Sequence, residues 1–295
     1  MELRLLRYFV TVAEEESISR AAARLHITQP TLSRQIRDLE EELGCRLLIR
    51  SRSRHKVVPT EQGRLLLERA REILSLSDRL KSDFAQEGPV RGEVAIGGGE
   101  TQGMRLLAQT AADLHRICPG IRFHVYSGNA SFVADRMEKG LIDLGVLVGE
   151  TDLAKYDYLP LPVDDVWGLV MRPDHPLCAR ASVSREDLSG VPLIVSQQTM
   201  TENELAGWSG GSLDQLQIVA TYNLLYNAAL LVESGLGLAL ALDKLAGPEL
   251  AFRPLEPRLR ARLNLVWLRH RTLSPAVQLF LGHLRQRLTQ HVDEQ

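Results

Sequence analysis

The sequence has few cysteines, few aromatic residues and no long hydrophobic segment. Its three cysteines, Cys45, Cys118 and Cys178, are widely separated, so they provide neither the closely spaced ligands of a structural zinc site nor a disulfide framework. Reduced thiols are expected, with a redox role for one of them as the alternative.

No apolar run approaches the ~18 residues of a membrane span, and the first residues lack a signal-peptide core. We therefore expect a cytoplasmic protein without a metal, cofactor or membrane partner.

Catalytic motifs are also missing. Neither GxSxG nor HExxH occurs, the histidines are scattered, and the acidic pair Asp164-Asp165 has no companion base that spacing would identify. These motifs are local signatures of nucleophilic and metal-dependent hydrolysis, so their absence removes the commonest grounds for assigning an enzyme. The sequence predicts a protein that acts by binding.

Length and charge indicate several compact units with an uneven charge distribution. The chain has 295 residues, is 44% hydrophobic and carries a net charge of −2, which allows two or three buried cores. Residues 1–60 hold 11 Lys and Arg against 8 Asp and Glu, a net of +3 that leaves −5 for the rest. Residues 46–56 include five Lys and Arg and no acidic residue, and their exposed part, 50–56, lies between the β-prone runs 47–49 and 57–58. This predicts a hairpin wing with a basic tip that contacts phosphates.

The segment from Ile18 to Leu43 predicts two short helices joined by a tight turn. Apolar residues recur every three or four positions in both halves, so each half has one apolar face and the two faces can pack together. Residues 26–28 are too few for anything but a turn. Thr28 is suited to cap the second helix, and Pro30 to its first turn. This is the pattern of a helix-turn-helix.

The second of these helices leaves one polar face free. Arginine and small polar groups near a helix N-terminus suit the major groove, where an arginine can donate two hydrogen bonds to guanine. The alternative is a solvated face on an ordinary helical hairpin. Together with the basic wing, the residues predicted to contact DNA are Thr28, Gln29, Pro30, Thr31, Ser33, Arg34, Arg37, Arg50, Arg52, Arg54 and Lys56.

An ordered set of residues in this region resembles the N-terminal signature of LysR-type transcriptional regulators. The matching strings are RAAARLHI, TQPTLSRQIRDLEEELGCRLLIR and VPTEQG. Two packing positions depart from the family: Leu48 stands where Phe is usual, and Pro59 where an aliphatic residue is usual. The positions that carry the resemblance are Ala21-Ala22, Leu25, Gln29-Pro30, Ser33-Arg34-Gln35, Leu39-Glu40, Leu43-Gly44, Arg50, Thr60 and Gly63.

The resemblance implies an α/β multidomain regulator. Its expected parts are a winged helix-turn-helix over 1–59, a linker helix for dimerisation over 60–89, and a two-lobed periplasmic-binding-like effector domain over 90–295. The implied partners are double-stranded promoter DNA, a small-molecule effector, RNA polymerase and further copies of the chain, as a homodimer or a dimer of dimers.

The linker region predicts one long helix from Thr60 to about Gln86, which ends before Gly88-Pro89. Apolar and small residues recur in it at heptad spacing, which favours pairing with the same helix of a second chain. The alternative is that this stripe packs on the protein's own globular domain. The predicted dimerisation residues are Leu66, Ala70, Ile73, Ser77, Leu80 and Phe84.

From Arg91 onward, short β-prone runs alternate with helical ones, which is typical of βαβ units around a mostly parallel sheet. No internal repeat supports two lobes. The division into lobe I (about 90–161 and 267–295) and lobe II (about 162–266) rests on the order of elements and on the resemblance. The expected strands are 93–97, 121–126, 143–148, 165–171, 193–195, 216–221, 237–242 and 264–268, and the expected helices are 104–117, 132–141, 224–234 and 275–288.

Polar residues at the ends of predicted strands mark the candidate ligand site, because ligands of open α/β sheets bind beyond the carboxyl ends of the strands. The glycine-rich stretch 97–103 precedes a helix whose N-terminal amides can receive an anion or a polar group, and it lacks the GK[ST] ending of a P-loop. For Thr101, Ser127 and Asn223, helix capping is the alternative. The predicted effector-binding residues are Gly99, Glu100, Thr101, Ser127, Gly128, Asn129, Val148, Ser196, Gln197, Gln198, Asn223, Tyr226 and Asn227.

These patterns predict a ligand-responsive DNA-binding regulator. A DNA-binding enzyme and an architectural DNA-binding protein that needs no ligand are the alternatives. A rise in melting temperature with small metabolites separates the regulator from the architectural protein, because a ligand that binds only the native state stabilises it.

Overall fold

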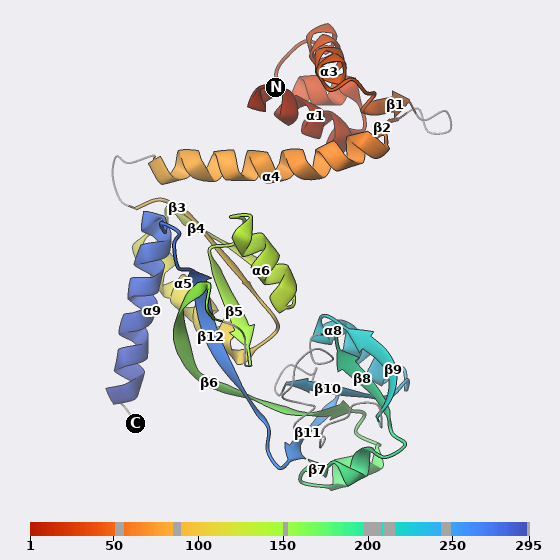
Figure 1. Cartoon of the computed structure of the whole chain (residues 1–295), viewed down its shortest axis with the longest axis vertical. Helices are drawn as coiled ribbons and strands as arrows, with labels where there is room; N and C mark the ends of the chain where they lie inside the picture. The colour runs from red at the N-terminus through yellow and green to blue at the C-terminus, as the bar shows by residue number, and fades with distance from the viewer. Residues whose placement is uncertain are drawn as a thin grey trace. The chain divides into compact units, whose positions relative to one another are not determined.

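The computed structural model describes residues 1–50, 56–84, 90–149, 153–197, 208, 216–242 and 249–293. The chain divides into two compact units, Met1–Phe84 and Ala85–Gln295, and Figure 1 traces both. Arg52, Arg54 and Gln198, three of the residues predicted to contact DNA or effector, lie outside the described residues.

The first unit is a winged helix-turn-helix followed by a long helix, as the sequence predicts. Its small core joins the three N-terminal helices and includes Phe9, Val12, Leu32 and Leu39, all fully buried. The elements are α1 (Leu3–Glu15), α2 (Ile18–Arg24), α3 (Gln29–Leu43), β1 (Leu48–Arg50), β2 (Val57–Pro59) and α4 (Glu61–Phe84), with β1 antiparallel to β2.

The second helix of the helix-turn-helix begins and ends at the expected residues. The Thr28 hydroxyl accepts a hydrogen bond from the amide of Thr31 at 3.4 Å, and Pro30 lies in the first turn. Gly44 ends the helix in the left-handed conformation, with φ +66°, which costs a residue without a Cβ little. Local sequence therefore fixes both ends of α3.

Thr28→Ala is expected to lower the free energy of unfolding by about 0.5–2 kcal/mol, because it removes this cap. The measurement is the midpoint of urea unfolding followed by circular dichroism. Thr31→Ala is the control, since it removes only a contact between the two hydroxyls, 2.8 Å apart. Equal losses in both variants would mean that the cap contributes nothing of its own.

The wing and the long helix are tied together at their junction. Glu40 on α3 accepts a hydrogen bond from the amide of Leu47 at 2.7 Å. The Thr60 hydroxyl donates to the Arg46 carbonyl at 2.8 Å and accepts from the amide of Gly63 at 2.9 Å. A Cβ on Gly63 would lie 2.1 Å from the Leu47 carbonyl oxygen, so only glycine lets the first turn of α4 approach the wing this closely.

The second unit is an α/β structure whose strands form one continuous path, β4-β3-β5-β12-β6-β10-β8-β9. β3, β4 and β5 are parallel, as are β8, β9 and β10, whereas β6 and β12 are antiparallel to their neighbours. The elements up to the second lobe are β3 (Gly92–Gly98), α5 (Gln102–Ile117), β4 (Ile121–Ser127), α6 (Ala130–Glu138), β5 (Leu144–Val148) and β6 (Tyr156–Met171). The remainder are η1 (Pro176–Ala179), β7 (Val183–Ser184), η2 (Glu186–Leu188), β8 (Pro192–Ser196), β9 (Gln217–Tyr222), α8 (Leu225–Glu233), β10 (Leu238–Leu242), β11 (Ala251–Glu256), β12 (Arg260–Leu268) and α9 (Pro275–Asp293).

Two lobes arise because β6 belongs to both halves of this path. Its first part, with Tyr156, pairs with β12, and its last part, with Val170, pairs with both β10 and β11. From Leu263 onward β12 pairs with β5 of the first lobe, so the chain returns to that lobe earlier than the predicted boundary at residue 267. The sequence also missed β7, which has only two residues, and β11, which contains Pro254.

Each lobe has its own core on both faces of its strands. In the first lobe, α5 and α9 share a core on one face and α6 covers the other. In the second lobe, α8 covers one face, and residues from η1, β7 and η2 cover the other. Within the described part of the chain, no helix is long and apolar enough to cross a membrane.

Candidate nucleic-acid interface and ligand cleft

The outer face of α3 carries the predicted DNA-contacting side chains in accessible positions. Arg34 is exposed, and among the described residues it forms no hydrogen bond or ion pair. Arg37 is also exposed, and its Nε donates only to the Ser33 carbonyl at 3.4 Å. Both guanidinium groups can therefore donate to a nucleic acid without losing an ion pair. Exposed with them are Thr28, Gln29, Pro30 and Thr31, and Ser33 is half-buried.

A groove runs between α3 and the wing, lined on α3 by Ser33 and Arg37 and on the other side by Arg46 and Ile49. Arg46 is exposed, and it was not among the residues predicted to contact DNA. Two arginines along one groove suit the phosphates of a DNA backbone. Arg46 is the first residue of the basic run 46–56, for which contact with phosphates was predicted, although Arg46 itself was left out of the predicted DNA-contacting residues.

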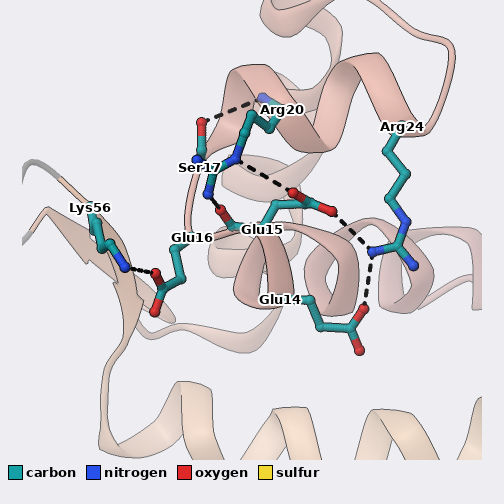
Figure 2. Close-up of polar contacts among 7 residues, drawn as sticks. All are labelled: Glu14, Glu15, Glu16, Ser17, Arg20, Arg24 and Lys56. Atoms are coloured by element: carbon teal, nitrogen blue, oxygen red, sulfur yellow. Dashed lines mark hydrogen bonds and ion pairs between the residues drawn. The ribbon is translucent and has the colours of Figure 1, made fainter.

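Other basic residues of this unit are neutralised by the acidic end of α1, as Figure 2 shows. Lys56 on the wing pairs with Glu16, and Arg24 on α2 pairs with Glu14 and Glu15, at 3.5 and 3.1 Å. Lys56 was predicted to bind phosphate, but its ammonium already has a carboxylate partner. Arg50 belongs to β1, and its side chain lies outside the described residues.

The stripe predicted for dimerisation on α4 divides between two faces of the helix. Ala70 is fully buried, together with Leu74, against Leu6 and Val10 of α1 in the same chain. Leu66 is half-buried in the same contacts. For Ala70 and Leu66, the alternative of packing on the protein's own domain is therefore correct.

A second apolar face of α4 remains exposed. Successive residues of a helix are rotated by about 100°, which places this exposed face roughly a quarter turn around α4 from the buried face. The predicted heptad stripe therefore contains residues of both faces. Ser77 is half-buried near its border. The exposed face consists of Leu65, Ile73, Leu76, Leu80 and Phe84, which are 60%, 39%, 37%, 59% and 78% exposed.

In the second unit, strand register brings the predicted ligand-site residues of the first lobe to one sheet edge. Gly98 at the end of β3 is paired with Ser127 of β4 and with Val146 of β5. The loops that follow, with residues 99–101 and 127–129, are therefore adjacent, and the amide of Gly128 donates to the Gly98 carbonyl at 3.0 Å. Val148 is half-buried and packs against the cores of both lobes.

The predicted residues of the second lobe also gather at one edge. Ser196 of β8 is paired with Tyr222 of β9, whose carbonyl accepts from the amide of Gln197 at 2.9 Å. Asn223 is exposed and does not cap α8, whose N-cap residue is Leu224. Tyr226 and Asn227 are exposed on the first turn of α8.

The Glu100 carboxylate connects the sheet edge of the first lobe with that of the second lobe. Glu100, in the loop after β3, accepts a hydrogen bond from the amide of Leu225, the first residue of α8. Burial raises the pKa of the Tyr222 phenol, and the negative charge of Glu100 raises it further. Tyr222 therefore stays protonated, and its hydroxyl donates to the Leu240 carbonyl at 2.8 Å.

The helix ends at the cleft are already occupied. Both carboxylate oxygens of Asp165, on β6, lie 3.2 Å from the amide of Gln102 at the start of α5. Asn129 caps α6, because its side-chain oxygen accepts from the amide of Phe132 at 3.0 Å. Asp165 therefore takes the amide at the start of α5 that was expected to be open to an anion. Asn129 acts as a helix cap, a role that was considered from the sequence only for Thr101, Ser127 and Asn223. Thr101 differs: its hydroxyl is buried and has no hydrogen-bond partner in the part of the chain that the structure describes.

The possible metal ligands and the cysteines can be placed in the described part of the chain. No group of three His, Cys, Asp or Glu side chains there is arranged to hold a metal ion. Cys45, Cys118 and Cys178 are half-buried free thiols.

Two family models match this sequence. One, described as a bacterial regulatory helix-turn-helix protein of the lysR family, covers residues 3–64. The other, described as a LysR substrate binding domain, covers residues 87–289. Together they span both units of the structure.

Known relatives and solved structures agree with these models. A hydrogen peroxide-inducible genes activator from Dickeya chrysanthemi is 36% identical over 196 residues, which are 66% of this chain and only 63% of that protein. An SDS degradation transcriptional activation protein from a Pseudomonas species is 32% identical over 297 residues, covering 95% of this chain and 94% of that protein. The crystal structure of full-length CbnR complexed with the target DNA matches with a TM-score of 0.72 at 22% identity, over 97% of this chain and 99% of that one.

Proposed function

Because this chain belongs to the LysR family of DNA-binding transcriptional regulators, we propose that it binds promoter DNA as a homodimer or a dimer of dimers and that an effector between its lobes changes that binding. The proposal includes contact with RNA polymerase at the promoter and no catalytic role. Since its target is chromosomal DNA, the proposed site of action is the cytoplasm. The observation that carries the proposal is the exposed Arg34 on α3, which has no partner among the described residues.

Dimerisation is proposed through the exposed apolar face of α4. Large hydrophobic side chains gathered on one helix face mark a contact surface. Two α3 helices on one pseudo-palindromic site double the contacts of one, and the two half-sites then lie one or more helical turns apart.

The experiment is genome-wide footprinting of the full-length protein. The proposal expects protected sites that contain two related half-sites, separated by a multiple of about 10 base pairs. Protection without a shared sequence would instead indicate an architectural protein. The genes beside the protected sites also provide the metabolites for a melting-temperature screen, which is used to identify the effector.

Thr101 is the residue whose proposed effector contact is best supported, because its buried hydroxyl lacks a partner. A bound ligand that supplies a partner gains a hydrogen bond, worth about 0.5–1.5 kcal/mol. Thr101→Val is therefore expected to weaken effector binding about two- to twelvefold, while the free protein is as stable as the wild type or more stable. Calorimetry with the identified effector and thermal unfolding without it provide the two readouts.

Asn129→Ala provides the contrasting variant, since Asn129 caps α6. It is expected to lower stability by about 0.5–2 kcal/mol and to leave effector affinity nearly unchanged. If Thr101→Val bound effector normally and Asn129→Ala did not, the assignments of the two residues would be reversed.

A further inference from the structure

Three helices begin at the cleft edges, and the chain's own side chains accept hydrogen bonds from the N-terminal amides of each. Asp165 binds the start of α5, Asn129 the start of α6, and Glu100 the start of α8. The N-terminus of a helix carries a partial positive charge and unpaired amides, so it attracts anions. Here two of the three positions already hold a carboxylate.

Glu100 is distinctive because its contact crosses from one lobe to the other. It lies 125 residues before Leu225 in the sequence, and it belongs to the loop after β3, whereas Leu225 opens a helix of the second lobe. Asp165 is fully buried on the strand that joins the lobes. Two carboxyl groups, those of Glu100 and Asp165, therefore lie near the contact between the lobes.

A second observation points to a ligand at this place. Thr101 follows Glu100 directly and precedes Gln102, whose amide is held by Asp165. Thr101 is only 4% exposed, and its hydroxyl has no partner among the residues that the structure describes. A buried hydroxyl without a ligand or water to bind it is costly in a folded protein. This hydroxyl can donate to or accept from a bound molecule.

We propose that Glu100 acts as a built-in anion at the N-terminus of α8, so that the cleft excludes free carboxylates and takes an effector that carries an amine, a guanidine or another cationic donor group. A second anion at this helix end would meet the negative charge of Glu100 and find the Leu225 amide occupied. A cation or a strong donor gains from the Glu100 carboxylate. This inference rests on the proposed function, because it names the chemical class of that effector.

The test uses two four-carbon probes of opposite charge, succinate and 1,4-diaminobutane, with the full-length protein at constant ionic strength. Calorimetry is expected to show no measurable succinate binding by the wild type. Glu100→Ala frees the Leu225 amide and is expected to bind succinate at least tenfold more tightly than the wild type. Glu233→Ala, at the other end of α8, is the matched control and is expected to behave as the wild type.

Glu100→Gln separates charge from hydrogen bonding, because glutamine retains an oxygen that can accept from Leu225. It is expected to weaken diaminobutane binding at least tenfold and to unfold at nearly the wild-type temperature. Equal succinate binding by the wild type and Glu100→Ala overturns the proposal, as does diaminobutane binding that is unchanged in Glu100→Gln. These measurements contain no DNA, so either result is independent of the footprinting experiment.

Discussion

Leu80→Asp is expected to abolish dimer formation and, with it, tight binding to a site with two half-sites. Leu80 is 59% exposed in the single chain, so the substitution leaves the folded unit nearly as stable as before, within about 0.5 kcal/mol. In a dimer joined through α4, the aspartate would be buried without a partner, which costs about 3–5 kcal/mol. This corresponds to a loss of roughly 100- to 5,000-fold in dimer affinity.

Sedimentation equilibrium measures the oligomeric state of this variant, and gel-shift titration measures DNA binding. Ser75→Asp places the same charge on α4, about 140° around the helix from Leu80, and should remain dimeric. A Leu80→Asp protein that stays dimeric would remove the exposed face of α4 from the subunit contact.

Arg34→Ala is expected to remove discrimination between base sequences worth about 1–3 kcal/mol, a factor of roughly 5 to 150. The reason is that the Arg34 guanidinium has no partner among the described residues and lies on the exposed face of α3, where it can donate two hydrogen bonds to one guanine. The measurement is the ratio of affinities for a footprinted site and for random DNA of the same length.

Arg52→Ala tests the other kind of contact. It belongs to the basic run of the wing and is predicted to meet phosphate, so its loss should weaken all DNA similarly and lower the salt dependence by about one contact. An Arg34→Ala protein that lost affinity equally for specific and random DNA would show that α3 does not read bases through this residue.

The local parts of the fold were predictable from the sequence. The helix-turn-helix follows from apolar periodicity and from Thr28 and Gly44, which act on neighbours within a few residues. The strands β3, β4 and β5 and the helices between them also follow from periodicity and strand-ending residues. These signals depend on residues close together in the sequence, so they can be interpreted without knowing the tertiary packing.

The parts that were missed depend on contacts between distant residues. Leu66 and Ala70 fit a heptad as well as Leu80 does, and only the packing of α1 on α4 separates them. Likewise, the stretch at residues 97–103 resembles an open anion site, and only Asp165, 63 residues from Gln102, fills it. Glu100 was selected for its position at a strand end, but its partner on α8 has no local signature.

The close contact at Gly63 means that α4 and the wing move together when α4 tilts. The helix has 24 residues and, at 1.5 Å per residue, is about 36 Å long. A tilt of about 10° applied at one end therefore moves the other end by about 6 Å, which is nearly two base-pair steps of DNA at about 3.4 Å each. Gly63 and Thr60 hold the first turn of α4 against Leu47 and Arg46. Most of the displacement of α4 is therefore transmitted to the wing. A small angular change at the far end of α4 is thus enough to move the attached helix-turn-helix along the DNA by one to two base pairs.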